Sequence, residues 1–261
     1  MKQTSDTSFE PDWLSLREPA DHAARDASLL KRAGAEFAAG TTVLDLGSGT
    51  GSTARAFAAA GFSDLNWRFY DQDRALLKIA EEQFPNADCI TGDIADIENL
   101  SFDDVGLITA SALFDLMSED WITSFIVRAE KFTTPIYAAL NYNGVMRWTP
   151  GDPEDAEITE AFNAHQRRDK GTGAALGPTA ATTFARIAKA RGWHVATAES
   201  PWQLGPENGP LRAKLLVGIA TAAEETGARN ALSWHARRSG MATSNLWVGH
   251  IDVLAIPGAA T

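Results

Sequence analysis

Short apolar runs alternate with amphipathic stretches along the first half of the chain. Runs rich in β-branched and apolar residues predict strands at residues 41–46, 65–70, 88–91, 105–110 and 135–140. Apolar residues at helical spacing predict helices at residues 19–39, 52–60, 73–84 and 119–132. Strands that alternate with helices form right-handed βαβ units, so the pattern predicts a doubly wound α/β fold with a mostly parallel sheet.

The alternation changes after residue 141. Two long segments, at about 143–178 and 200–244, are rich in Gly, Pro and charge, and their length indicates cap insertions rather than ordinary connections. Helices are predicted within them at 154–168, 211–226 and 229–238. A helix at 179–191 and strands at 193–198 and 246–256 complete the pattern. We expect an N-terminal helical lid at 1–40 and a core domain at 41–261.

Composition and charge exclude several classes of protein. The 261 residues include 23 Lys and Arg against 34 Asp and Glu, a formal charge of −11 that argues against a general nucleic-acid binder. The single cysteine, Cys89, excludes a disulfide framework or a Cys-rich metal site. No run of about 18 apolar residues is present, and residues 1–9 are polar, unlike a secretory signal. We expect a cytoplasmic protein that needs neither metal nor membrane.

A glycine-rich loop, from Gly47 to Gly51, follows the first predicted strand and precedes a predicted helix. Glycines at this position allow a tight turn and a close approach of the backbone to a ligand. The dinucleotide fingerprint would require glycine at position 52, where the chain has Ser52. Asp45 lies two residues before the first glycine, and its carboxylate favours a ligand with an amino group over a pyrophosphate.

Two more acidic residues follow the next predicted strands. Asp71 ends the second strand, where a carboxylate can accept two hydrogen bonds from a ribose diol. Asp93 follows the third strand and can accept a hydrogen bond from an exocyclic amine. Each acid alone is typical of a helix cap or a loop, and we expect Asp73 to cap the following helix. Three acids at successive strand ends beside a glycine loop indicate one ligand site.

This set of motifs, over about residues 41–141, resembles the class I S-adenosylmethionine-dependent methyltransferases. The resemblance implies a Rossmann-like sheet of seven strands with an antiparallel last strand, and S-adenosyl-L-methionine as cofactor. It places the glycine loop at the methionine part, Asp71 at the ribose, and Asp93 with Ile94 at the adenine. The implied cofactor-binding residues are Asp45, Gly47, Ser48, Gly49, Asp71, Gln72, Asp93, Ile94 and Ser111. More loosely, residues 13–21 and 165–171 resemble bacterial trans-aconitate-methyltransferase-like proteins.

The acceptor is less defined by the sequence. The Asn-Pro-Pro-Tyr signature of amino-methylating enzymes is missing after the fourth strand, which weakens a base or amide nitrogen as acceptor. Residues 165–170 contain four potential cations, typical either of a solvated helix end or of a clamp for an anion. We predict that Arg167 and Arg168 face the cleft. The predicted substrate-binding residues are Arg17, Phe114, Asn141, Tyr142, His165 and Arg168.

The leading hypothesis is in-line SN2 methyl transfer to a small anionic molecule, through a carboxylate or hydroxyl oxygen. A carboxylate needs no base, whereas a hydroxyl needs one, and Asp115, His165 and Tyr142 are the candidates; no catalytic residue is assigned. The alternatives are a non-catalytic S-adenosylmethionine sensor or partner protein, and an enzyme that transfers another group from the same cofactor. An NAD-dependent dehydrogenase is disfavoured by Ser52 and Asp45. The sequence leaves the oligomeric state open.

Overall fold

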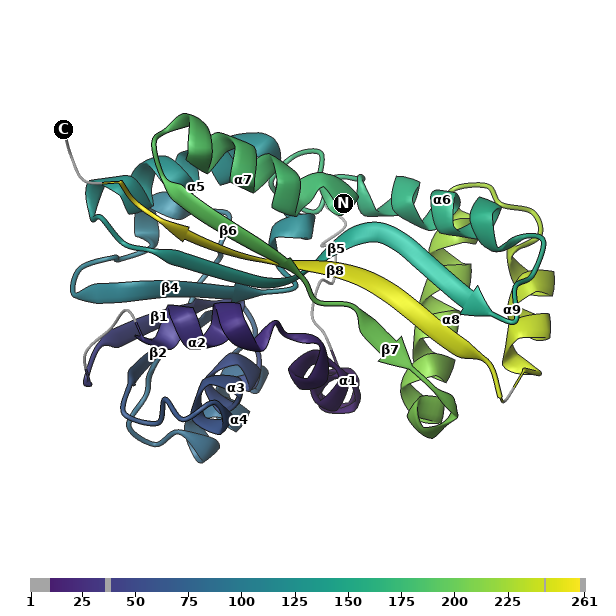
Figure 1. The fold of residues 1–261 in the computed structure, drawn as a ribbon, viewed down its shortest axis with the longest axis horizontal. Helices are drawn as coiled ribbons and strands as arrows, with labels where there is room; N and C mark the ends of the chain where they lie inside the picture. The colour runs from purple at the N-terminus through teal and green to yellow at the C-terminus, as the bar shows by residue number, and fades with distance from the viewer. Residues whose placement is uncertain (1–9, 36–38, 242, 259–261) are drawn as a thin grey trace, which may run out of the picture.

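The computed structural model describes residues 10–35, 39–241 and 243–258. Within these residues the strands form an eight-stranded sheet in the order β3-β2-β1-β4-β5-β8-β6, with β7 paired to β8 (Figure 1). The strands are β1 (Thr42–Leu46), β2 (Asn66–Asp71), β3 (Asp88–Thr91), β4 (Val105–Ser111), β5 (Ile136–Thr149), β6 (His194–Glu199), β7 (Trp202–Leu204) and β8 (Asn245–Ile256). The helices are α1 (Pro11–Ala24), α2 (Ala27–Ala35), α3 (Ser52–Ala59), α4 (Arg74–Gln83), α5 (Glu119–Lys131), α6 (Asp155–Gln166), α7 (Ala180–Ala190), α8 (Gly209–Glu225) and α9 (Ala231–Ser239).

The strand directions confirm the predicted α/β class. Strands β3, β2, β1, β4 and β5 pair in parallel, and β8 lies antiparallel between β5 and β6. The chain order reverses at β1, whose neighbours are β2 and β4, so the carboxyl ends of these strands border a crevice where ligands bind in open sheets. The short strand β7 is additional to the seven strands that were expected.

Helices cover both faces of the parallel part of the sheet. Helices α5 and α7 lie on one face, and α2, α3 and α4 lie on the other (Figure 1). The apolar side of α5 carries Trp121, Ile122 and Phe125, all buried against the sheet. On the opposite face Phe57 of α3 packs edge-on against Trp67 of β2. Burial of both faces explains why the central strand β4 is a nearly continuous buried run rather than an alternating one.

Strands β5 and β8 continue well beyond the parallel sheet as a long two-stranded ribbon. The register runs from Ile136 opposite Ala255 to Thr149 opposite Asn245, with shifts between residues 138 and 141 and between residues 142 and 146. The sequence prediction ended this strand at residue 140, because the long segment that follows is rich in Gly, Pro and charge. The pairing with β8 supplies the backbone hydrogen bonds that local sequence cannot show.

Helices α6, α8 and α9 pack against the ribbon and enclose a second hydrophobic cluster. Trp148 and Trp234 meet edge to face with ring centroids 5.4 Å apart, and Trp202 belongs to the same cluster. These buried rings pack the insertions onto the ribbon. The ribbon, β7 and the three helices are called the ribbon half below.

The N-terminal segment differs from the single helix predicted at residues 19–39. It forms α1 and α2, separated at Arg25, whose backbone is extended with φ −50° and ψ 135°. The Asp26 carboxylate accepts a hydrogen bond of 2.7 Å from the Leu29 backbone, while the Asp26 backbone N–H donates to Asp252 at 2.9 Å. This long-range contact fixes the break. Residues 1–9 and 36–38 of the predicted lid lie outside the described residues.

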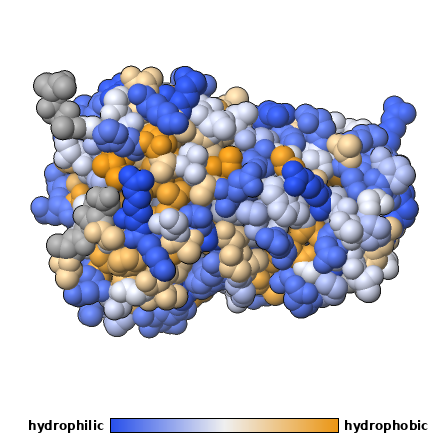
Figure 2. Space-filling model, in the orientation of Figure 1, coloured by the Kyte–Doolittle hydropathy of each residue, from blue (hydrophilic) through white to orange (hydrophobic). Residues whose placement is uncertain are grey.

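Polar and charged side chains cover most of the molecular face in Figure 2, and apolar residues form small groups between them. None of the helices within the described residues is long and apolar enough to cross a lipid bilayer.

Candidate active site

The glycine loop follows β1 and turns sharply before α3. Gly47, Gly49 and Gly51 all have positive φ angles, of 62°, 54° and 83°. A Cβ atom at Gly47 would lie 3.2 Å from Leu113, and one at Gly49 would lie 3.2 Å from Leu14. The backbone conformation therefore favours glycine, and side chains here would also narrow the space above the loop.

Asp71 holds the loop from the neighbouring strand. One carboxylate oxygen accepts a hydrogen bond of 2.8 Å from the Gly49 backbone N–H, and the other accepts one of 2.9 Å from the Asp73 backbone. Burial raises the pKa of the Asp71 carboxyl, and the backbone donors oppose that shift. A carboxylate oxygen has two lone-pair sites, so Asp71 keeps acceptor capacity for a diol. Asp73 accepts from the Ala75 and Leu76 backbones, which confirms that it caps α4.

Asp45 lies beneath the loop, almost completely buried. One of its carboxylate oxygens accepts a hydrogen bond of 2.8 Å from the Thr109 hydroxyl. The other oxygen has no hydrogen-bond partner among the described residues. Burial raises the pKa of Asp45 to about 7, opposed by the Thr109 hydrogen bond and by the positive charge of Arg25. This carboxyl group is therefore poised between its neutral and ionised forms near neutral pH.

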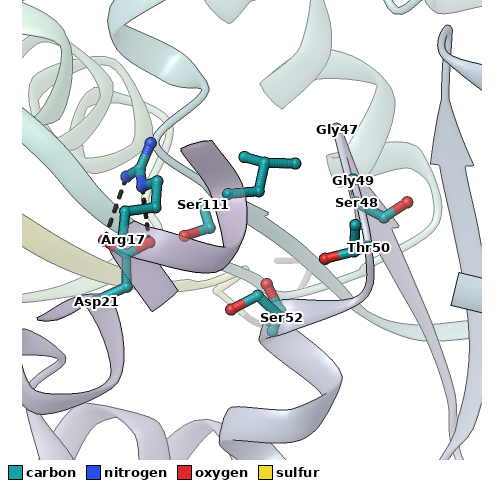
Figure 3. A pocket seen from close by; sticks show the side chains of 10 residues that line it. Arg17, Asp21, Gly47, Ser48, Gly49, Thr50, Ser52 and Ser111 are labelled. Carbon is teal, nitrogen blue, oxygen red and sulfur yellow. Dashed lines mark hydrogen bonds and ion pairs between the residues drawn. The ribbon is translucent and has the colours of Figure 1, made fainter. Parts of the chain in front are cut away.

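A cavity of about 510 Å³ extends from the ends of β2 and β3 past the glycine loop to α1 and the segment after α6. Seven of the nine predicted cofactor-binding residues line it: Gly47, Gly49, Asp71, Gln72, Asp93, Ile94 and Ser111. Ser48 lines a smaller adjoining pocket, between the loop and α1 (Figure 3). Asp45 lines neither pocket and lies behind the loop. The structure thus brings the acids at positions 71 and 93 to one cavity with the loop.

Helix α1 forms a wall of the site opposite the glycine loop. Leu14 and Arg17 of this helix line both pockets. Glu18 forms a bidentate ion pair with Arg55 of α3, with both hydrogen bonds at 2.6 Å. His22 lies 3.1 Å from both the backbone oxygen and the hydroxyl of Ser52. These contacts hold α1 against the first turn of α3, beside the loop.

Arg17 is the predicted substrate-binding residue that the structure places at the cavity. Its guanidinium donates to both carboxylate oxygens of Asp21, at 2.8 and 3.2 Å, and lies 5.2 Å from the centre of the Trp202 ring. Asp21 also accepts a hydrogen bond of 2.9 Å from the Trp202 indole. The ion pair is visible in Figure 3, beside Ser111. Arg17 is therefore held rigidly at the cavity wall.

Three other residues predicted to bind the substrate are buried in packing or hydrogen bonds, which corrects that prediction. Phe114 is 1% exposed and packs on Phe125 and Phe184 in the core. The Asn141 amide donates to the backbone oxygens of residues 138 and 251, where the register of β5 and β8 shifts. The Tyr142 hydroxyl donates to Asn163 at 2.9 Å. None of the three lines the two pockets described here.

The basic cluster after α6 is also placed differently from the prediction. Arg167 and Arg168 have side chains 46% and 44% exposed, and they pair with Glu160 and Glu225. His165 shares Glu225, at 3.0 Å, rather than lining either pocket. Carboxylates on α6 and α8 draw these cations to the surface, an arrangement that depends on tertiary contacts. Lys170 from the same cluster does line the main cavity, together with Gln166.

Lys170 is a cavity residue that the sequence did not single out from its basic neighbours, and Asp115, one of the three candidate bases, lies in the turn after β4. No hydrogen bond or ion pair involves the Lys170 ammonium within the described part of the chain. Burial lowers the pKa of Lys170, and nearby Arg168 adds to that effect. Asp115, in the turn after β4, is 9% exposed, and one of its oxygens is buried without a described partner. Only the tertiary structure distinguishes Lys170 from its basic neighbours.

Comparisons with known proteins agree with this geometry. Residues 43–135 match the sequence model of a methyltransferase domain family. The comparison with curated proteins finds no match. The cyclopropane synthase MmaA2 from Mycobacterium tuberculosis aligns with a TM-score of 0.53 at 15% identity, over 95% of this chain and 94% of that chain.

Two further solved structures are similar. Geranyl diphosphate C-methyltransferase from Streptomyces coelicolor A3(2), solved with Mg2+, geranyl diphosphate and S-adenosyl-L-homocysteine, aligns with a TM-score of 0.50 at 12% identity, over 89% of this chain and 79% of that chain. An S-adenosylmethionine-dependent methyltransferase from Geobacter sulfurreducens, in complex with S-adenosyl-L-homocysteine, aligns with a TM-score of 0.49 at 17% identity. The alignment covers 95% of this chain and 99% of that chain. The likeness to the cyclopropane synthase and to the C-methyltransferase, at 15% and 12% identity, shows the fold alone.

The sheet order, the reversed β8 and the glycine loop facing strand-end carboxylates define an α/β protein of the methyltransferase fold. Residues 43–135 match the methyltransferase domain model, and the fold is similar to that of the cyclopropane synthase and of the geranyl diphosphate C-methyltransferase described above.

Proposed function

We propose that this protein transfers the methyl group of S-adenosyl-L-methionine to a small anionic molecule, at a carboxylate or hydroxyl oxygen. The observation that carries the proposal is the convergence of Asp71, Asp93 and the glycine loop on one cavity of about 510 Å³. When bound, the cofactor supplies an electrophilic methyl group on a positively charged sulfur.

The residues present fit this cofactor. Gly47 and Gly49 line the cavity with backbone atoms, and their positive φ angles favour glycine at both positions. Asp71 would accept the ribose hydroxyls, and Asp93 with Ile94 would hold the adenine at the other end of the cavity. The unpartnered oxygen of Asp45, behind the loop, would favour the positively charged amino end of the methionine part.

The charge at the far end of the cavity supports an anionic acceptor. Lys170 lines the cavity and no described residue neutralises it by a hydrogen bond or ion pair. Arg17 adds a second cation, although Asp21 offsets part of its charge. An acceptor carboxylate or phosphate would complete the pairing of Lys170, and a guanidinium can grip such a group at two points.

We further propose that α1 acts as the lid of the site, and that the insertions at 143–178 and 200–244 act as its cap. Leu14 lies over the glycine loop, and the Glu18–Arg55 ion pair holds the helix there. A closed site would exclude water from the acceptor and hold it in line with the methyl group. Such orientation contributes much of the rate acceleration in transfers of this kind.

Calorimetric titration tests the cofactor part of this proposal. We expect S-adenosyl-L-methionine and S-adenosyl-L-homocysteine to bind at one site per chain, and NAD to give no binding. Absence of binding by both sulfur compounds would overturn the proposal. A protein that binds them but releases no S-adenosyl-L-homocysteine with any small anionic acceptor would be a sensor or partner protein rather than an enzyme.

A further inference from the structure

Asp115 lies in the turn after β4, between residues that face the cavity. Leu113, Leu116 and Met117 line the cavity around it, and the Asp115 side chain is 9% exposed. One carboxylate oxygen is buried without a hydrogen-bond partner in the described part of the chain. Buried carboxylates are normally hydrogen-bonded, so an unpartnered oxygen beside a cavity indicates a group that meets its partner in a ligand.

Asp252 shows what a structural carboxylate in this protein looks like. It is completely buried and accepts four hydrogen bonds, two from backbone N–H groups and two from hydroxyls. The donors are Asp26, Leu140, Tyr137 and Ser200. Asp115 has no such set of donors. The difference argues that Asp115 is retained for chemistry rather than for packing.

Three charged or titratable groups surround Asp115 from different elements: Arg17 of α1, Tyr142 of β5 and Lys170 after α6. Burial raises the pKa of Asp115 to about 6, and the charges of Arg17 and Lys170 oppose the increase. Both of these cations line the cavity. The carboxyl group can therefore take up and release a proton near neutral pH, as a general base requires.

The two other candidate bases are less suited. The Tyr142 hydroxyl is committed to Asn163, and burial raises its pKa far above neutral pH. His165 is paired with the half-exposed Glu225 of α8 at 3.0 Å, on the side of α6 that carries Arg168 to the same carboxylate. Asp115 is the candidate that combines burial, an unpartnered oxygen and neighbours at the cavity wall.

We propose that Asp115 accepts the proton from a hydroxyl group of the acceptor, and that the acceptor is a small hydroxylated anion held by Lys170 and Arg17. This inference rests on the proposed function. The acceptor oxygen forms a bond to the methyl carbon as the carbon–sulfur bond breaks, and the electron pair of that bond stays on sulfur. The hydroxyl proton goes to Asp115 and then to solvent, which leaves a methyl ether and S-adenosyl-L-homocysteine.

A hydroxyl fits this site better than the other acceptors. A carboxylate is already ionised and would leave Asp115 without a role. A neutral amine would gain positive charge on methylation, between Arg17 and Lys170, which the local field opposes. A hydroxyl loses its proton during the transfer and therefore needs a nearby base.

A panel of matched acids tests the acceptor class. Succinate, malate and aspartate form one set, and benzoate with its hydroxy and amino derivatives forms another. We expect release of S-adenosyl-L-homocysteine and an O-methyl ether product only with hydroxylated members. Formation of methyl esters or N-methyl products, or no turnover of any hydroxy acid by a protein that binds the cofactor, would overturn the inference. Failure to bind the cofactor would instead overturn the proposed function.

Substitution of Asp115 tests the proton transfer. In Asp115→Asn we expect kcat to fall about 100-fold or more, while the Kd for S-adenosyl-L-homocysteine stays within about twofold. Wild-type kcat/KM should fall as the pH drops below about 6, and the variant should lose this dependence. Asp120→Asn, an exposed change nearby on α5, is the matched control and should behave as wild type.

The wild-type pH profile keeps the test independent of how well the variant folds. A profile without a decrease below about pH 6, or an Asp115→Asn variant with kcat within about threefold of wild type, would overturn the assignment. Asp115→Glu retains a carboxylate and should recover part of the lost rate.

Discussion

The glycine-loop half of the molecule and the ribbon half differ in how their buried charged groups are hydrogen-bonded. In the ribbon half, Arg238 is 1% exposed, and it donates to both oxygens of Asp155 and to the backbone oxygen of residue 150. In the glycine-loop half, which comprises β1 to β4 and their loops, Asp45 and Asp115 each keep a buried oxygen without a described partner. Burial raises their pKa values to about 7 and about 6.

The difference separates charges that maintain architecture from charges that serve a ligand. A buried ion pair with complete hydrogen bonding fixes the position of α9 against the loop after β5. An unpartnered buried carboxyl group costs stability, and the surrounding fold must hold it in place. Such groups concentrate at functional sites, and here both belong to the glycine-loop half, with Asp45 behind the glycine loop and Asp115 next to residues that line the cavity.

The largest expected effect is on the ribbon half. Arg238→Met removes the positive charge from the Asp155 carboxylate, which keeps the Trp234 indole and the Asp152 backbone as donors, and we expect a loss approaching the roughly 3–5 kcal/mol of unfolding free energy typical of a broken buried pair. Urea denaturation measures this loss. Arg237→Met is the matched control, because the Arg237 side chain is 41% exposed and solvent screens its pairs with Asp152 and Glu154. Equal losses in the two variants would contradict the comparison.

The pH dependence of stability should reveal Asp45. Its raised pKa means that the folded state binds a proton between about pH 4 and 7 while the unfolded state does not. Ionisation of Asp45 in the folded protein therefore lowers the free energy of unfolding as the pH rises through this window, by up to about 1.4 kcal/mol per pH unit.

Asp45→Asn removes this titration. Urea denaturation at pH 5 and at pH 7 gives the free energy of unfolding at each pH. From pH 5 to pH 7 this free energy should decrease more for the wild type than for the variant. Identical decreases would show that Asp45 is not the group that titrates.

Cofactor affinity should depend on Asp71. Asp71→Ala removes the proposed acceptor for the ribose hydroxyls and the hydrogen bond to Gly49, and we expect weaker binding by about 1–3 kcal/mol. Calorimetry with S-adenosyl-L-homocysteine measures the change, with the exposed Asp88→Ala as control. Unchanged affinity would place the ribose elsewhere.

The smallest expected effect is at the lid. Glu18→Gln weakens the partly exposed ion pair with Arg55, which should cost no more than about 1 kcal/mol of stability. Stopped-flow binding should show faster dissociation of S-adenosyl-L-homocysteine, because α1 is held less firmly over the glycine loop. An unchanged dissociation rate would mean that α1 does not gate the site.

The sequence predicted the glycine-loop half well because its signals are local. Each strand from β1 to β4 is a short apolar run, and the glycines and acids follow it directly. Asp71 and Asp93 could be placed near each other because parallel strands end at the same edge of a sheet.

The ribbon half depended on long-range contacts that no local pattern encodes. The second part of β5 lies at the start of a segment rich in Gly, Pro and charge, and its pairing with β8 joins residues about 100 positions apart in the chain. The same limit applies to the acceptor residues: Arg167 and Arg168 turn to Glu160 and Glu225, whereas Lys170, two residues further, lines the cavity. Their charges are alike in sequence, and only the positions of α6 and α8 distinguish them.

A crystal structure with bound S-adenosyl-L-homocysteine tests directly whether Asp71 and Asp93 hold the nucleoside in the cavity. We expect the ribose hydroxyls on Asp71 and the adenine beside Asp93 and Ile94. The sulfur should point toward the part of the cavity lined by Arg17 and Lys170. A nucleoside bound away from Asp71 and Asp93, or in the reverse orientation along the cavity, would contradict it.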